Sequence, residues 1–112
     1  MIKRVCVFAA SSDAARPQFE AVARELGRRI SDLDLELVFG AGKVGLMGAV
    51  AEGAREGGSH IVGVIPKKLD VPALTYLDCD ELVVTETMAE RKAVMAQRSD
   101  GFVILPGGFG TL

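Results

Sequence analysis

Continuous apolar runs alternate with amphipathic stretches along the chain. Apolar runs occupy 5–10, 35–39, 61–65 and 102–105, with a shorter one at 81–84. A continuous run such as 5–10 is typical of a strand in a parallel sheet that is covered on both faces, and the other runs, interrupted only by Glu36 or beginning with Glu81, are of similar character. Between them, helical spacing predicts helices over 17–33, 46–56 and 87–98. Strands and helices in this order predict an α/β fold, an open Rossmann-like parallel sheet with helices on both faces.

Local signals set the ends of these helices. Pro17 suits a first helical turn, Gly57-Gly58 is a typical helix stop, and Thr87 with Glu90 forms a capping-box pattern. The first helix is expected to bury one apolar stripe, made of Phe19, Val22, Ala23, Leu26, Ile30 and Leu33. The segment 67–80 is irregular and leaves a short helical turn open.

Size and charge narrow the range of functions. A chain of 112 residues is expected to form a single domain over 1–112, and its net charge of −2 gives no general attraction to nucleic acid or anionic membranes. Its apolar runs are shorter than the roughly 20 residues of a membrane span, and its first residues do not form a signal peptide. We therefore expect a cytoplasmic protein with no nucleic-acid or membrane partner.

The residues that could bind a ligand follow the carboxyl ends of the predicted strands. These ends hold Ser11-Ser12, the glycine-rich stretch 40–45, Pro66-Lys67 and the run 106–111, which reads PGGFGT. In an open α/β sheet, ligands bind at this edge, and a glycine-rich turn that opens a helix offers backbone N–H groups to an anion. The sequence therefore predicts an anion-binding crevice.

Two familiar nucleotide motifs fit poorly. Gly40, Gly42 and Gly45 match the spacing of a dinucleotide-binding turn, but the match lies on the second βα unit, and the strand after it ends in Pro66-Lys67-Lys68 where a ribose-binding acid is expected. Close helix–strand packing or a different nucleotide contact explains these glycines better. Lys43 is not part of an ATP-binding P-loop, because Val44 replaces the required hydroxyl.

Other polar residues have simple structural interpretations. Cys6 is expected to pack inside a strand, His60 to lie in a loop, and Asp78, Asp80 and Glu81 to form a solvated acidic loop. Neither the cysteine spacing nor the single histidine provides the ligands of a zinc site, so no metal is predicted.

A basic pair, Arg91 and Lys92, lies on the helix that leads to the last strand. Adjacent helical residues point about 100° apart, so only one is expected to face the crevice fully. A solvated basic surface is the alternative, but the position next to the 106–111 loop favours the crevice. On the same helix, Met88 and Met95 are expected to pack in the core, although Met88 could instead flank a base.

Four segments together resemble the LOG family, whose members are also catalogued as lysine decarboxylase-like proteins. These segments are VFAASS at 7–12, FGAGKVGLMGAVA at 39–51, IVGVIP at 61–66, and the stretch from MAERKAVMA to LPGGFGTL. The resemblance implies hydrolysis of the N-glycosidic bond of a nucleoside 5′-monophosphate, such as AMP or isopentenyladenosine monophosphate, to free base and ribose 5-phosphate. It implies no cofactor, and no lysine stands in a pyridoxal-phosphate context that would support decarboxylation.

The resemblance also implies roles for individual residues. Arg91 matches the family's catalytic arginine. The residues expected to bind substrate and phosphate are Ser12, Gly42, Gly45, Met88, Lys92, Gly107, Gly108, Gly110 and Thr111. The family also suggests a homodimer or higher homo-oligomer. A non-catalytic nucleotide-binding or molybdenum-cofactor carrier protein of the same fold remains an alternative.

The sequence departs from the family pattern at its end. The family motif continues as PGGxGTxxE, with a glutamate two positions beyond Leu112 that would stabilise oxocarbenium-like charge or position the attacking water. We therefore expect the sequence to be a fragment of a longer protein whose sheet it leaves incomplete. A polypeptide that ended here would have little or no hydrolase activity.

Overall fold

The computed structural model describes residues 2–9 and 17–105. The strands are β1 (Arg4–Phe8), β2 (Glu36–Phe39), β3 (Ile61–Pro66), β4 (Glu81–Thr85) and β5 (Gly101–Ile104). The α-helices are α1 (Pro17–Asp32), α2 (Gly45–Glu56) and α3 (Met88–Gln97), and a short 3₁₀ helix spans Lys67–Leu69. Each predicted strand and helix is present, with ends shifted by one or two residues, and the turn left open after β3 is this 3₁₀ helix.

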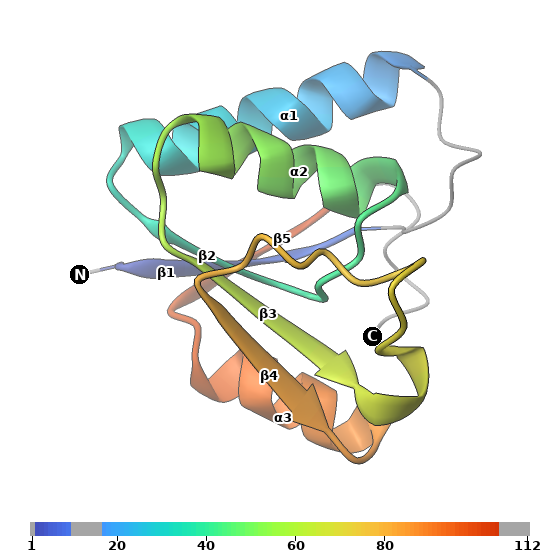
Figure 1. Ribbon diagram of the computed structural model, residues 1–112. Coiled ribbons are helices and arrows are strands. Elements are labelled where there is room, and N and C mark those ends of the chain that lie inside the picture. The colour runs from blue at the N-terminus through green and yellow to red at the C-terminus, as the bar shows by residue number, and fades with distance from the viewer. Residues whose placement is uncertain (1, 10–16, 106–112) are drawn as a thin grey trace.

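The strands form one parallel sheet in the order β4-β3-β2-β1-β5. Helices α1 and α2 cover one face and α3 covers the other, as Figure 1 shows. The predicted Rossmann-like α/β fold is confirmed. The chain moves outward from β1 to β4 and then returns to place β5 on the other side of β1, so the strand order reverses at β1.

The register brings the carboxyl ends of three strands together. Val7 of β1 pairs with Phe39 of β2 on one side and with Val103 of β5 on the other. Residues that follow these positions therefore lie along one edge of the sheet. This edge, beside the point where the strand order reverses, is where open α/β sheets place their ligands.

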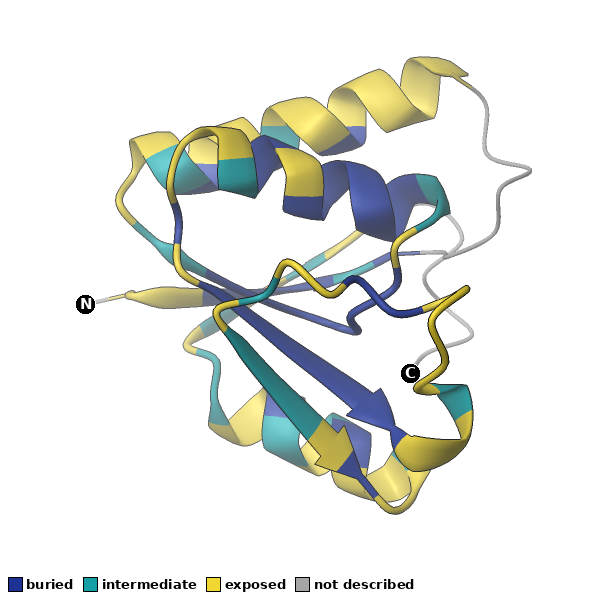
Figure 2. Ribbon diagram, in the orientation of Figure 1, coloured by how far each residue is buried: buried dark blue, intermediate teal, exposed yellow. Residues whose placement is uncertain are grey.

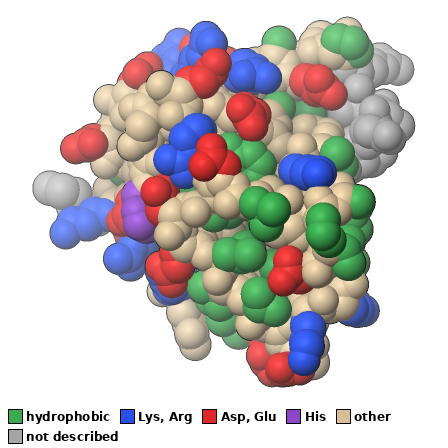
Figure 3. All heavy atoms as spheres, viewed as in Figure 1, with side chains coloured by type: hydrophobic (Ala, Val, Ile, Leu, Met, Phe, Trp, Pro, Cys, Tyr) green, Lys and Arg blue, Asp and Glu red, His purple; other side chains and the backbone are tan. Residues whose placement is uncertain are grey.

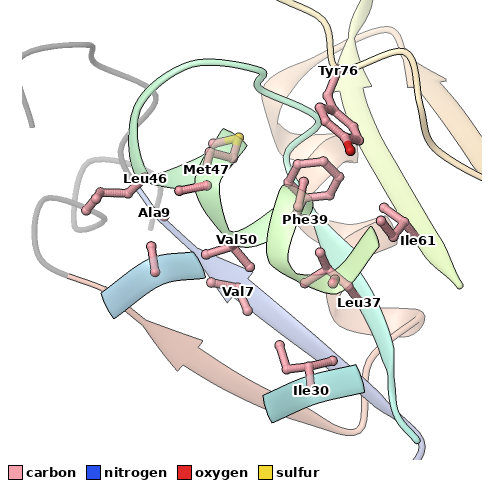
Figure 4. Close-up of a cluster of buried hydrophobic side chains, with 14 of the residues drawn as sticks. Val7, Ala9, Ile30, Leu37, Phe39, Leu46, Met47, Val50, Ile61 and Tyr76 are labelled. Atoms are coloured by element: carbon pink, nitrogen blue, oxygen red, sulfur yellow. The ribbon is translucent and has the colours of Figure 1, made fainter. Parts of the chain in front are cut away.

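Alternating residues of the strands supply two separate cores. On the side of α1 and α2, the cluster contains Val7, Leu37, Phe39, Val50 and Ile61, as Figure 4 shows. On the side of α3, the core cluster comprises Cys6, Val38, Val62, Val64 and Met95. Figure 2 shows β3 buried along its length, as expected for a central strand with both faces covered.

The buried face of α1 differs from the predicted one. Ala23, Gly27 and Ile30 are buried, whereas the side chains of Phe19, Val22 and Leu33 are 39%, 61% and 69% exposed. The reason is a close crossing with α2, in which a Cβ at Gly27 would lie 2.2 Å from the carbonyl oxygen of Val50. The helices approach through small residues, and this contact turns much of the apolar stripe outward.

The segment between β3 and β4 lies against the glycine-rich loop that follows β2. The N–H of Tyr76 donates to the carbonyl of Ala41 at 2.7 Å, and the N–H of Lys43 donates to that of Leu74 at 3.0 Å. The Tyr76 ring packs edge-on against Phe39, with ring centroids 5.8 Å apart. These contacts fix the position of the loop at the carboxyl end of β2.

Apolar side chains also remain on the surface. Figure 3 shows hydrophobic side chains gathered on the face that carries β4 and the segment before it, where Val71, Leu74, Leu77 and Val84 are exposed. Within the described ranges, no helix has the length and apolar character needed to cross a membrane.

Candidate functional site

The start of α3 sets the position of Arg91. The Thr87 hydroxyl accepts a hydrogen bond from the N–H of Glu90 at 3.1 Å, as the capping-box pattern predicts. The Glu90 carboxylate accepts from the N–H of Glu86 at 3.2 Å, one residue earlier than the usual partner at Thr87. Because the helix begins at Met88, Arg91 lies in its first turn, near the carboxyl ends of β2 and β3.

Arg91 is buried among main-chain carbonyl groups. Its Nε donates to the carbonyl of Val64 at 2.9 Å and its Nη2 to that of Gly40 at 2.5 Å. Its Nη1 lies 3.8 Å from the Met88 sulfur. Only 7% of the residue is exposed, and this burial lowers the pKa of Arg91. Among the described residues it forms no ion pair with a carboxylate.

A pocket that is partly open to solvent lies beside this guanidinium. Its lining comes from the ends of β1 and β2 and from the helices on both faces of the sheet. The lining residues are Val7, Phe8, Ala9, Gly40, Met47, Met88, Arg91, Lys92 and Met95. Apolar walls with two cationic side chains suit a ligand that joins a flat apolar ring to an anionic group.

The two basic residues differ in exposure, as expected from their helical spacing. Arg91 is buried in the pocket, whereas Lys92 is half-buried at its lining. Met95 of α3 is buried in the core between this helix and the sheet, which confirms its predicted packing role. Met88 is half-buried and also lines the pocket, so it can contact a bound ligand.

The glycine-rich loop shapes one wall of this region. Gly45 begins α2 with φ of +66°, a conformation that favours glycine. The N–H of Gly42 donates to the Met47 sulfur at 2.9 Å, and Gly42 also pairs with Thr75 in an isolated bridge. Neither glycine is among the described residues that line the pocket, whereas Gly40 is. Gly40 also accepts the hydrogen bond from Arg91. No local pattern could have revealed this contact, because Arg91 lies 51 residues later in the chain.

Lys43 connects the same loop to the segment before β4. Its Nζ donates to the carbonyl of Pro72 at 2.8 Å. A Cβ at Gly48 would lie 2.2 Å from the Lys43 carbonyl oxygen, so the loop packs tightly against the first turns of α2. The Lys43 amine therefore has a structural contact in the described part of the chain.

Asp78 and Asp80 are exposed, as predicted for an acidic loop, but the acids before and within β4 also form ion pairs. Asp80 accepts from the N–H of Ile61 at 2.7 Å and from Arg55 Nη2 at 3.2 Å, and these bonds hold the pKa of Asp80 below its ordinary value. Glu81 accepts two bonds from Arg98, at 2.6 and 2.9 Å, which also lower its pKa. These acids connect β4 to neighbouring elements.

Potential metal ligands do not gather in the part of the chain that the structure describes, where no three His, Cys, Asp or Glu side chains form a metal-binding group. Cys6 is fully buried in β1, as predicted, and burial raises the pKa of its thiol to about 11. His60 is exposed in the loop before β3, also as predicted.

Five of the predicted binding residues lie outside the described residues. These are Ser12, Gly107, Gly108, Gly110 and Thr111. The described pocket thus contains Arg91, Lys92 and Met88 from the predicted set, with Gly42 and Gly45 in the adjoining loop. Sequence reasoning placed Gly40 at the crevice only as part of the 40–45 stretch, and it missed Met47 and the end of β1 as parts of the site.

Comparison with known proteins places the chain among nucleotide-processing relatives. The profile of the family described as "Possible lysine decarboxylase" matches residues 47–112. A protein of Oryza sativa subsp. japonica, "Probable cytokinin riboside 5'-monophosphate phosphoribohydrolase LOGL9", is 48% identical over 98% of this chain and 48% of its own length. Cytokinin riboside 5'-monophosphate phosphoribohydrolase LOG7 of Arabidopsis thaliana is 43% identical over 98% of this chain and 51% of its own length. The chain spans about half the length of these relatives.

Solved structures share the fold. The molybdenum cofactor carrier protein of Chlamydomonas reinhardtii superposes with a TM-score of 0.81 at 25% identity, over 99% of this chain and 66% of that protein. The molybdenum cofactor binding protein of Rippkaea orientalis gives a TM-score of 0.82 at 22% identity, with the same coverage, which supports the fold alone. Because the family profile covers more than half of the chain, and the curated relatives match nearly all of it, the protein belongs to the lysine decarboxylase-like family that contains the LOG phosphoribohydrolases.

Proposed function

We propose that this protein takes part in hydrolysis of the N-glycosidic bond of nucleoside 5′-monophosphates, with AMP and isopentenyladenosine monophosphate as candidate substrates. Water adds across the bond between C1′ and the base nitrogen. The oxygen of water goes to C1′, which gives ribose 5-phosphate, and a proton goes to the free base. The 43–48% identity to proteins named for this activity on cytokinin riboside 5′-monophosphates supports the proposal.

The observation that carries the proposal is the state of Arg91. Its guanidinium is held by two main-chain carbonyls at the carboxyl edge of the sheet, and within the described residues no carboxylate neutralises it. A buried cation without a counter-charge is costly, so an anionic ligand in the pocket would be bound strongly. The phosphate of a nucleotide would supply such a counter-charge, and its ribose hydroxyls would accept hydrogen bonds. Arg91 would also balance charge near the leaving base.

The other roles follow from this placement of Arg91. Lys92 and the 42–45 loop would complete the nucleotide pocket, and Met88 would flank the base. Backbone N–H groups of Gly107, Gly108, Gly110 and Thr111, with the Thr111 hydroxyl, would hold the 5′-phosphate. Ser12 would bond ribose or phosphate. With these assignments we propose that residues 1–112 form a single nucleotide-binding α/β unit, as the N-terminal part of a longer domain.

The proposed reaction also needs a carboxylate, because the transition state resembles an oxocarbenium ion. In the family motif this glutamate stands two positions after Leu112. Since the chain spans about half the length of its curated relatives, hydrolysis is best tested in two forms. One is the 112-residue chain, and the other is a chimera in which the C-terminal half of the Arabidopsis relative follows Leu112.

The test is release of free base. Each form is incubated with AMP, isopentenyladenosine monophosphate and adenosine, and the products are separated by chromatography. Base from a monophosphate but not from adenosine supports a phosphoribohydrolase, and the ratio of the two monophosphate rates distinguishes a cytokinin-activating enzyme from an AMP nucleosidase. No base from either monophosphate, in a chimera that still binds AMP, would reject the proposal.

That last outcome would favour a carrier. The specific observation in its support is the match to the molybdenum cofactor carrier protein of Chlamydomonas reinhardtii, at 25% identity. A carrier would need the anion-binding groups but no glutamate. For either function we also propose that the protein is cytoplasmic. We further propose that it forms a homodimer or higher homo-oligomer, and light scattering would test this oligomeric state.

A further inference from the structure

At the edge of the pocket, the Arg91 guanidinium lies where a side chain on residue 40 would be. A Cβ built on Gly40 would lie 2.3 Å from Arg91 Nη2 and 3.1 Å from Arg91 Cζ. The same Nη2 donates a hydrogen bond to the Gly40 carbonyl at 2.5 Å. The guanidinium therefore fills the volume that any side chain at position 40 would need.

The main chain around Gly40 is held on both sides. Phe39 pairs with Val7 and with Gly63 inside the sheet, and the Ala41 carbonyl accepts from the N–H of Tyr76 at 2.7 Å. Ala41 has φ of +61°, a left-handed conformation that costs free energy in a residue other than glycine and persists only where its surroundings hold it. The clash with a side chain at position 40 would therefore be relieved by movement of the guanidinium rather than of the main chain. The guanidinium can move because it is the end of a flexible side chain and lies beside an open pocket.

The bonds of Arg91 show what that movement would remove. A guanidinium has five N–H donors, and here Nε is used by Val64 and one Nη2 donor by Gly40. Nη1 contacts only the Met88 sulfur, at 3.8 Å, among the bonds within the described residues. The two carbonyl bonds fix the plane of the group beside the pocket that Arg91 lines.

We propose that Gly40 is a positioning residue for Arg91, because its missing side chain makes room for the guanidinium and its carbonyl orients it. Its effect on activity rests on the function proposed above, whereas its effect on Arg91 does not. The first glycine of the glycine-rich loop thus serves an arginine 51 residues away rather than the pyrophosphate of a dinucleotide.

The first experiment reads Arg91 directly, in the 112-residue protein. The Nε–H signal of Arg91 is assigned by its loss in Arg91→Ala, and its hydrogen exchange is followed by NMR. We expect slow exchange in the wild type and at least tenfold faster exchange in Gly40→Ala. Gly101→Ala is the matched control, because among the described residues a Cβ at Gly101 would meet only Ile2 Cδ1, at 3.8 Å. A Gly40→Ala protein in which this signal stays protected would overturn the proposal.

A double-mutant cycle separates positioning from simple packing. With AMP as the probe, Gly40→Ala should weaken binding at least tenfold in the wild type and leave it unchanged in the Arg91→Ala background. An equal loss in both backgrounds would overturn the proposal. If Gly40→Ala alone fails to fold, recovery of folding in the double variant supports the proposal, and failure of the double variant as well would refute it.

The outcomes also distinguish this proposal from the proposed function. If no nucleotide releases base but Gly40→Ala exposes the Arg91 Nε–H, the positioning role stands and the hydrolase proposal fails. If base is released and Gly40→Ala leaves both the rate and the Arg91 exchange unchanged, the hydrolase proposal stands and the positioning role fails.

Discussion

Arg91 of α3 donates from Nε to the main-chain carbonyl of Val64 in β3, at 2.9 Å. A helix on one face of the sheet thereby places a cationic side chain at the carboxyl ends of the strands. The guanidinium makes a second bond, from Nη2 to the carbonyl of Gly40 beyond the end of β2. The two bonds together need the forked arrangement of donors in a guanidinium. The geometry, and not only the charge, is specific to arginine.

Arg91→Lys is therefore expected to weaken nucleotide binding although the charge is kept. A lysine ammonium cannot reproduce both carbonyl bonds and still present a fixed pair of donors to a ligand. Loss of one charged hydrogen bond is worth about 1.5–3 kcal/mol, which corresponds to roughly a tenfold or larger rise in the dissociation constant of AMP. Isothermal titration calorimetry measures it. As a control, Arg29→Lys on the exposed side of α1, where Arg29 pairs with Glu25, should leave AMP affinity unchanged.

Gly27 and Gly53 let the backbones of α1 and α2 touch. A Cβ at Gly27 would lie 2.2 Å from the Val50 carbonyl oxygen, and one at Gly53 would lie 2.0 Å from that of Arg24. Helix propensity alone would make either glycine-to-alanine change stabilising by about 1 kcal/mol, but the contact with main-chain atoms should reverse the sign. We expect Gly27→Ala and Gly53→Ala each to lower the free energy of unfolding by about 1–3 kcal/mol in urea denaturation. An increase for either variant would contradict the described crossing.

The end of α1 offers a matched pair of substitutions. Asp34 has φ of +60°, and the N–H of Leu35 donates to the Ile30 carbonyl, as in a Schellman motif that normally carries glycine. Asp32 is the last residue of the helix itself. Both changes to glycine remove the same charge near the helix end, so the charge does not distinguish them. Glycine suits the left-handed conformation at position 34 but disfavours the helical one at position 32, so Asp34→Gly should be the more stable variant by about 1 kcal/mol. Equal melting midpoints would argue against the left-handed conformation of Asp34.

Asp80 should make stability depend on pH. Its pKa is lowered in the folded protein, first by the N–H of Ile61 and also by Arg55 and by His60, whose Nδ1 lies 3.9 Å away. Such a carboxylate contributes stability above its ordinary pKa of about 3.9, and this contribution is lost as the pH falls through the lower folded-state value. The side chain is 35% exposed, so solvent screening should limit the contribution to about 1 kcal/mol.

The measurement is the free energy of unfolding of the wild type and of Asp80→Asn between pH 7 and pH 3. The wild type should be more stable at pH 7, and the difference should narrow below about pH 4. Asp32→Asn, at the exposed C-terminal end of α1, is the control and should change stability slightly in the opposite sense, because it removes a negative charge from that helix end. A difference for Asp80→Asn that is the same at pH 3 and pH 7 would contradict the role given to its ionised form.

Much of the fold follows from local patterns in the sequence. The apolar runs predict the strands because a buried parallel strand has both faces in the core, and Thr87 predicts the start of α3 because its hydroxyl caps a helix end. At Gly58, with φ of +85°, the glycine pair ends α2 as predicted. These features depend on a few neighbouring residues, so one sequence suffices to predict them.

Features that depend on distant contacts were not predictable in the same way. Phe19 and Val22 match a helical apolar stripe, but the glycine crossing with α2 sets which face of α1 is buried. The acids at the start of β4 are paired because Arg55 and Arg98 reach them from α2 and from the end of α3. Arg91 could be singled out from its motif, but its bonds to main-chain groups 27 and 51 residues away appear only in the folded chain.

The measurement that tests the central claim most directly is the rate of base release from AMP by Arg91→Ala, made in the chimera that carries the family's glutamate. Removing one positioned charge-stabilising group costs on the order of 100- to 1000-fold in turnover, and we expect a loss of this size with an unchanged circular dichroism spectrum. Arg29→Ala, on the exposed face of α1, should keep the wild-type rate. An Arg91→Ala protein that releases base at the wild-type rate would contradict the catalytic role of Arg91.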